Sequence, residues 1–264
     1  MIQFRLGSLS RREFQPDVYG PGVISLTRIV WGSVGAGLLL FIIAFFSEKL
    51  QIGVLYPPLA ATCFINATCV YLRVARPKSV IVGHFVAMIG GLLGVIAGDW
   101  LFSNSSLLIA VKLGLAVLFS AMLMQIFDAD HPPAAATAAI PAILPLPAPA
   151  TLMPFHMAWG GVIAVLFAFA WNRIWLVWPP PDLDTTETWL GLHMEKPDTI
   201  GTGICILAAL LMGMKPWLET AYSIGILMML AGIILLATHH FFAAAHQMVP
   251  SRDESLGGKS TVDS

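Results

Sequence analysis

Apolar runs of membrane-spanning length recur along this 264-residue chain and constrain its fold more than any other feature. A helix needs about 20 apolar residues to cross the ~30 Å of hydrocarbon in a bilayer. Hydrophobic residues make up 57% of the sequence and charged residues only 11%, whereas soluble domains carry about 25% charged residues. A soluble chain of this length could not keep so much apolar surface from water. The sequence therefore predicts an all-α, polytopic transmembrane helical bundle.

Eight segments make up the predicted membrane region. In chain order they are residues 24–46, 57–72, 80–102, 107–127, 132–149, 155–178, 199–214 and 221–245. They divide the chain into a cytoplasmic N-terminal tail, a transmembrane core, a polar connecting loop, a C-terminal transmembrane hairpin and a polar tail. The bounds of these parts are residues 1–23, 24–178, 179–198, 199–245 and 246–264.

The basic residues are distributed unevenly among the predicted loops. If residues 132–149 cross the membrane, eleven of the fourteen Lys and Arg residues lie on the side of the termini, and only Lys49, Lys112 and Lys215 lie opposite. This bias fits the positive-inside rule, and it largely disappears if the stretch only enters and returns. We therefore predict a multi-pass protein of a bacterial inner membrane with both termini cytoplasmic. The net charge of −1 gives no indication of a nucleic-acid partner.

The most unusual stretch in this apolar chain is Asp128-Ala129-Asp130-His131-Pro132-Pro133. Proline cannot continue an arriving helix, but it suits the first turn of a new one. A short helix is therefore predicted over residues 132–140, followed by irregular chain around Pro141 and three further prolines. Non-helical backbone at membrane depth is tolerated only when it is buried in protein or lines a wet cavity. This stretch is the first candidate for a site.

An internal repeat relates this stretch to an earlier one. Residues 57–62 and 132–137 share the pattern P-P-x-A-A-T at a distance of 75 positions. The surrounding units, residues 24–102 and 107–178, hold three segments each, so the second unit must be inverted in the membrane. Proline-broken helices at matching positions of inverted repeats indicate a transporter's binding site near the bilayer midplane. The alternative is chance, because Ala, Pro and Thr are common in this chain.

The two proline pairs would start helices whose N-terminal ends point inward from opposite faces. Helix N-termini carry unpaired N–H groups and about half a positive charge, which makes them anion sites. Small residues after each pair let the two backbones approach closely. No motif for nucleophilic catalysis or nucleotide binding is present, so we expect a small inorganic anion as ligand, no enzymatic activity and no cofactor.

Three motifs, in order along the chain, resemble those of a known family. Residues 131–138, HPPAAATA, resemble the H-P-P-A-G-A-T-A motif of the HPP family of integral membrane proteins, with Ala135 in place of a glycine. Residues 58–62 are similar to that family's P-x-G-A-[ST] segment, and residues 76–84 to its Q-P-R-N-x-x-x-G-H segment. The resemblance covers residues 25–178. It implies nitrite as the substrate, because cyanobacterial and chloroplast members are associated with nitrite transport.

These observations define the candidate site residues. The residues expected to bind substrate are Pro58, Ala60, Thr62, Asn66, Arg76, His84, His131, Pro132, Pro133, Ala134 and Thr137. The residues considered for a proton relay are Asp99, Asp130 and His131. The bilayer and a second copy of the chain are the other expected partners, because cyclic oligomers are common.

Each candidate also has a structural interpretation. His131 either binds an anion or relays a proton, or it packs and caps a helix; ionisable groups within membranes usually serve a function. Asp130 is equally a helix cap, and Asp99 is equally an interfacial carboxylate. Arg76 and Lys78 either anchor a cytoplasmic loop or attract anions.

The hydroxyl and amide groups have a further alternative. Thr62, Asn66 and Thr137 either line the site or bond helix carbonyls four residues back. His239, His240 and His246 are interpreted as interfacial histidines, because His239 and His246 lie about 10.5 Å apart along a helix. A rival interpretation of the whole chain is a membrane-embedded enzyme or metal-binding protein that uses the Asp128, Asp130 and His131 cluster.

Overall fold

The computed structural model describes residues 3–7, 23–68, 72–102, 107–147, 149–175 and 196–247. In the sixth and the eighth α-helix, side chains are described only up to residues 172 and 238. The predicted connecting loop and C-terminal tail therefore lie largely outside the described residues, as do Cys69 and the side chains of the three C-terminal histidines. Cys63 and Cys205 are free and buried.

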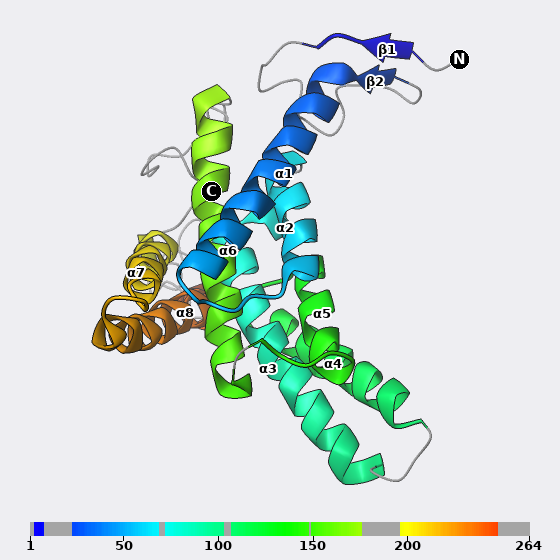
Figure 1. The fold of residues 1–264 in the computed structure, drawn as a ribbon, viewed down its shortest axis with the longest axis vertical. Coiled ribbons are helices and arrows are strands. Elements are labelled where there is room, and N and C mark those ends of the chain that lie inside the picture. Colours follow the sequence, from blue (N-terminus) through cyan, green and yellow to red (C-terminus); the bar gives the residue numbers. More distant parts are fainter. Residues whose placement is uncertain are drawn as a thin grey trace, which may run out of the picture.

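Eight α-helices form the bundle in the described part of the chain (Figure 1). Their positions agree closely with the eight predicted segments. Three short 3₁₀ helices, η2 Arg73–Ala75, η3 Ile140–Ala142 and η4 Ala150–Leu152, join some of them. The α-helices are α1 Leu26–Lys49, α2 Tyr56–Thr68, α3 Pro77–Phe102, α4 Leu108–Ile126, α5 Pro132–Ala139, α6 Met153–Trp175, α7 Lys196–Gly213 and α8 Glu219–Gln247.

Five of these helices, α1, α3, α4, α6 and α8, are long and apolar enough to cross a membrane. The span that contains α6 begins with η4, at Ala150. With 13 and 8 residues, α2 and α5 are too short to cross alone. The predicted multi-pass membrane protein is therefore confirmed, whereas a full crossing by residues 132–149 stays a prediction.

Two short β-strands differ from the all-α prediction. β1 Gln3–Arg5 and β2 Val23–Ser25 pair in parallel, with Phe4 opposite Ile24. The Ser25 side chain then accepts a hydrogen bond from the Arg28 backbone N–H at 3.2 Å and caps α1. Three residues per strand give too little periodicity for a sequence pattern to reveal.

The central helix of the bundle is α3, which contacts α4, α5 and α6. Figure 1 shows α6 passing through the middle of the molecule, with α7 and α8 packed together on one side and the α3–α4 hairpin extending from the other end. α2 packs on α6, α5 packs on α3, and α2 and α5 contact each other. Two equivalent three-helix units would give this pairing, and their inverted orientation stays a prediction.

The helices that precede the two proline pairs end in the same way. Gln51 follows α1 with φ 54° and Asp128 follows α4 with φ 51°. The next N–H groups, from Ile52 and Ala129, donate to the carbonyls of Ser47 at 3.0 Å and Met124 at 2.8 Å. This is the Schellman arrangement, with glutamine and aspartate at positions that usually hold glycine. It turns the chain sharply, and α2 and α5 start after connections of six and five residues (50–55 and 127–131).

Candidate functional site

Four buried polar side chains form one hydrogen-bonded line where α2, α3 and α5 meet. Thr62 Oγ1 lies 2.7 Å from His84 Nε2 and 2.9 Å from His131 Nε2. The other ring nitrogen of His84, Nδ1, lies 2.9 Å from Thr137 Oγ1. All four side chains are at most 1% exposed. We call Thr62, His84, His131 and Thr137 the His–Thr network.

The two threonines of this network are the last residues of the two P-P-x-A-A-T motifs. The motif helices thus meet at a single imidazole, His84, which α3 supplies. The sequence predicted all four residues as site candidates but gave no indication that His84 joins the two motifs. That relation depends on how three helices cross.

Two glycines on α3 allow this approach. A Cβ atom at Gly83 would lie 2.9 Å from both the Ala129 carbonyl oxygen and His131 Cβ, and one at Gly91 would lie 2.5 Å from the Ala138 carbonyl oxygen. Any side chain at either position would push α5 and the turn before it away from α3. His84 would then lose its contacts with the neighbouring helices.

The outer end of the network is fixed by a backbone carbonyl. His131 Nδ1 lies 2.7 Å from the Val74 oxygen in η2. A carbonyl oxygen only accepts, so Nδ1 carries the hydrogen and, in a neutral ring, Nε2 accepts. The Thr62 hydroxyl then donates to His131 and accepts from His84 Nε2, and the Thr137 hydroxyl donates to His84 Nδ1. With both rings neutral, this is the one arrangement that satisfies every contact among these four side chains and Val74; the Pro58 carbonyl oxygen, 3.2 Å from Thr62 Oγ1, then receives no hydrogen from Thr62.

The start of α5 differs from a simple anion-binding N-terminus. Its N-cap residue is His131, whose side chain makes no capping bond, and Pro132 and Pro133 have no N–H. The next N–H, from Ala134, donates to the His131 carbonyl oxygen at 2.8 Å. The donors that α5 brings to the site are therefore side chains. Asp130 is exposed and is not the N-cap residue.

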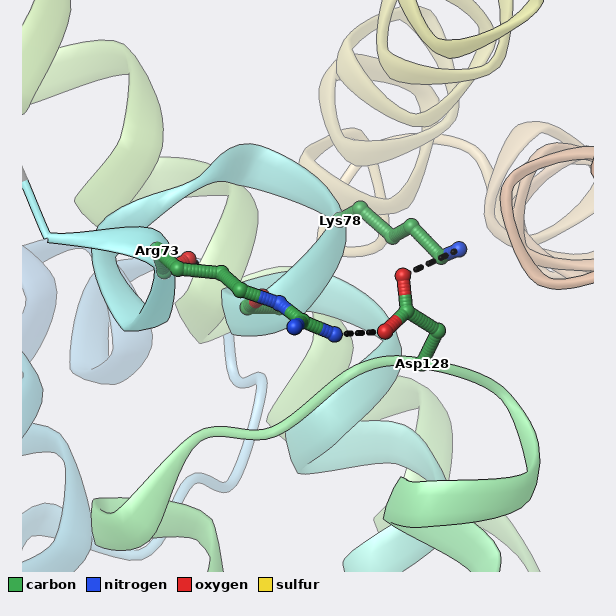
Figure 2. A network of polar contacts seen from close by, with 4 residues as sticks. Arg73, Lys78 and Asp128 are labelled. Atoms are coloured by element: carbon green, nitrogen blue, oxygen red, sulfur yellow. Dashed lines mark hydrogen bonds and ion pairs between the residues drawn. The ribbon is translucent and has the colours of Figure 1, made fainter. Parts of the chain in front are cut away.

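An ion-pair cluster lies directly beside the network. The Asp128 carboxylate contacts Arg73 Nη2 through Oδ1 and lies 3.7 Å from Lys78 Nζ through Oδ2 (Figure 2). The Asp128 carboxylate is thus held by two cations from η2 and α3. Arg76, the basic residue chosen from the sequence, is exposed and contributes its backbone N–H to the Arg73 carbonyl at 3.1 Å.

Two asparagines extend the polar surface along α2. Asn66 lies one helical turn after Thr62, and its backbone carbonyl accepts a hydrogen bond from Asn172 Nδ2 of α6 at 3.0 Å. Asn66 is 1% exposed, yet both of its side-chain polar atoms lack a partner among the described residues. Buried amides without partners are rare, so this one is a candidate for a role in binding. The sequence predicted Asn66 but missed Asn172.

The structure does not bring Asp99 to the network. Its carboxylate lies 2.6 Å from Lys112 Nζ of α4. Asp99 and His84 are 15 positions apart on α3, which corresponds to about 22 Å.

A third buried histidine, His156, was not among the candidates from the sequence. His156 of α6 is 1% exposed, with Nδ1 2.9 Å from the Gly53 carbonyl oxygen and Nε2 2.7 Å from Tyr222 Oη of α8. Lys215 Nζ lies 5.1 Å from the centre of the Tyr222 ring and donates to the Gln51 carbonyl at 2.6 Å. The sequence did contain a signal for this contact, because His156 stands in an apolar segment and histidines in such segments seldom lack a hydrogen-bond partner. This cluster attaches the α7–α8 hairpin to the loop before α2.

The metal interpretation of the Asp128, Asp130 and His131 cluster finds no geometric support. Among the described residues, no three His, Cys, Asp or Glu side chains lie close enough to hold a metal ion. Asp128 instead pairs with cations, and His131 points to Thr62 and Val74.

Comparisons with known proteins agree with this picture. The family described as HPP, transmembrane region, matches residues 21–179. A transmembrane protein of Dictyostelium discoideum is 32% identical over 124 residues, which are 46% of this chain and 42% of that protein. The chain thus spans less than half the length of this relative. No solved structure matches.

Proposed function

Because the chain belongs to the HPP family of transmembrane proteins, we propose that it is a transporter for a small inorganic anion and that nitrite is the substrate. The protein is a multi-pass membrane protein, and its distribution of basic residues favours cytoplasmic termini. The membrane we propose is a bacterial inner membrane. Transport, with no enzymatic reaction, is the activity that accounts for a polar site in the middle of an apolar bundle.

The observation that carries this proposal is the position of His84. It bridges the two motif threonines at 2.7 and 2.9 Å in a fully buried environment. Ionisable side chains are costly inside a membrane and are usually found on substrate or proton pathways. A purely structural contact between helices would not require two imidazoles, because apolar side chains can hold two helices together at a lower cost in free energy.

The network can also accept one proton without losing a contact. If His131 Nε2 takes up a proton, it donates to Thr62 Oγ1, and the Thr62 hydroxyl turns to the Pro58 carbonyl oxygen 3.2 Å away. Thr62 Oγ1 then accepts from both imidazoles through its two lone pairs. The resulting positive charge compensates a monovalent anion. A proton and an anion would then cross together without net charge, which avoids the cost of a buried unpaired ion.

The proposed anion site lies between the network and Asn66. The Asn66 amide provides N–H donors with no partner among the described residues, one turn from Thr62 on the same helix. The donors are thus those of the Asn66 amide on α2, and the protonated network supplies the compensating charge, in place of the backbone N–H groups expected from the sequence. The facing proline-started helices position these side chains.

Nitrite flux into proteoliposomes tests the proposal. We expect purified wild-type protein to transport nitrite and His131→Ala to lose that flux while it still elutes as a folded protein in detergent. A matched pair of variants isolates the network: Thr62→Val and Thr238→Val each remove a hydroxyl that bonds the carbonyl four residues back, but only Thr62 contacts the histidines. Normal flux through His131→Ala would remove His131 from the mechanism, and no flux through folded wild type would overturn nitrite as the substrate.

A further inference from the structure

We infer that Arg73 and Lys78 form the entry site for the transported anion, and that the Asp128 carboxylate occupies this site as an internal competitor. This inference rests on the proposed function and specifies where the anion first binds. The ligand class it predicts is a small planar monoanion with two oxygens on one central atom. Nitrite and formate both have this shape.

The geometry of the Asp128 carboxylate supports this ligand class. One oxygen contacts the Arg73 guanidinium and the other lies 3.7 Å from Lys78 Nζ, so that the two oxygens point to different cations (Figure 2). Arg73 therefore contacts one oxygen only, and the second oxygen of the ligand is recognised by Lys78. A free anion of the same shape would make the same two contacts after Asp128 moves away.

The entry site is connected to the His–Thr network through two short chain segments. Arg73 precedes Val74, whose carbonyl oxygen binds His131 Nδ1 at 2.7 Å. Asp128 precedes His131 by three residues, which span at most about 11 Å when fully extended. Displacement of Asp128 would therefore act directly on the turn that carries His131. The proposed entry site and the His–Thr network thus lie next to each other.

The charges and exposure of this cluster favour exchange with an anion in solution. Three basic residues, Arg73, Arg76 and Lys78, lie between the start of η2 and the first turn of α3. Two acidic residues, Asp128 and Asp130, lie in the connection before α5, so that cations exceed carboxylates by three to two. The Arg73 and Asp128 side chains are 54% and 32% exposed, whereas that of Lys78 is 12% exposed. The exposed Arg73–Asp128 pair contributes little to stability because water screens it. An arriving anion can replace the carboxylate at small cost.

The backbone conformation of Asp128 allows a substitution that changes the charge of the side chain and little else. Its φ of 51° lies in the left-handed region that asparagine tolerates as readily as aspartate. Asp128→Asn therefore removes the competing charge while it keeps the size of the side chain and the turn. Arg73→Gln removes the cation instead. Glu48→Gln and Lys49→Gln, two exposed residues at the end of α1, are the matched controls for each change of charge.

The experiment measures the Kd of nitrite and of formate for purified protein in detergent by isothermal titration calorimetry, beside nitrite flux in proteoliposomes. We expect Asp128→Asn to lower both Kd values by about three- to tenfold, Arg73→Gln to raise them by at least as much, and the controls to leave them unchanged. An unchanged Kd in Asp128→Asn and Arg73→Gln, with flux intact in wild type, would overturn the entry site and leave transport standing. Binding that follows the charge pattern without any wild-type flux would overturn transport and keep the site. Absence of both binding and flux would overturn both.

Discussion

Thr62 and Thr137, 75 positions apart in the sequence, hydrogen-bond opposite nitrogens of the same buried imidazole. Each threonine ends a proline-led motif on a different short helix, and His84 of α3 joins them. The relation makes His84 the residue through which α2 and α5 are coupled. The predictions below follow from this coupling and from the contacts around it.

Replacement of His84 should destabilise the bundle strongly. His84→Ala removes two hydrogen bonds and leaves the Thr62–His131 pair without its second partner in a dry environment. Each buried group left unpaired costs about 1–3 kcal/mol, so we expect a large fall in the Tm of the purified protein. Combining the variant with Thr137→Val should recover part of the loss, because one orphaned hydroxyl is removed. Independent, additive effects of the two changes would contradict the coupling.

A methyl group at Gly83 should disturb the site, whereas one at Gly114 should not. A Cβ at Gly83 would lie 2.9 Å from His131 Cβ and the Ala129 oxygen, but none of the atoms described lies within 4 Å of a Cβ at Gly114. Gly114→Ala should be neutral or stabilise α4 by about 1 kcal/mol through helix propensity. Gly83→Ala should lower both Tm and nitrite flux. Equal behaviour of the two variants in a thermal-shift and flux comparison would show that the close approach at Gly83 does not matter.

Tyr222→Phe should loosen the C-terminal hairpin without altering the substrate preference. The change removes the hydroxyl 2.7 Å from His156 Nε2 and leaves that nitrogen without its partner on α8. The expected loss is about 1–3 kcal/mol, measurable as a lower Tm. A change in the ratio of nitrite to formate flux would instead place His156 on the transport path.

An inward proton gradient should accelerate nitrite uptake by wild-type protein. The network takes up a proton at His131 Nε2 in the proposed mechanism, so that protons on the entry side favour loading of the anion. His131→Gln keeps one hydrogen-bonding group but does not titrate, and it should transport, if at all, at a rate that no longer follows the gradient. Equal gradient dependence in this variant and in wild type would exclude His131 as the proton carrier.

Much of the architecture could be predicted from local sequence. Apolar runs predicted the positions of the five helices that are long enough to cross a membrane, because crossing depends on length and hydropathy. Pro132 predicted the start of α5, since proline fixes its own backbone angle and lacks an N–H. Thr62, His84, His131 and Thr137 were candidates because polar side chains are conspicuous in an apolar chain.

Only the tertiary structure decided how these residues are connected. His84 lies between two threonines because glycines on α3 let α5 approach, and His131 binds Val74 because a Schellman turn places it there. Asp99 pairs with Lys112 and Asp128 with Arg73 and Lys78, although the sequence left their roles open. The sequence by itself determined which polar side chains stand in apolar segments, where unpaired polar groups are costly in a membrane. It did not determine which partners they found, because that depends on contacts between helices far apart in the chain.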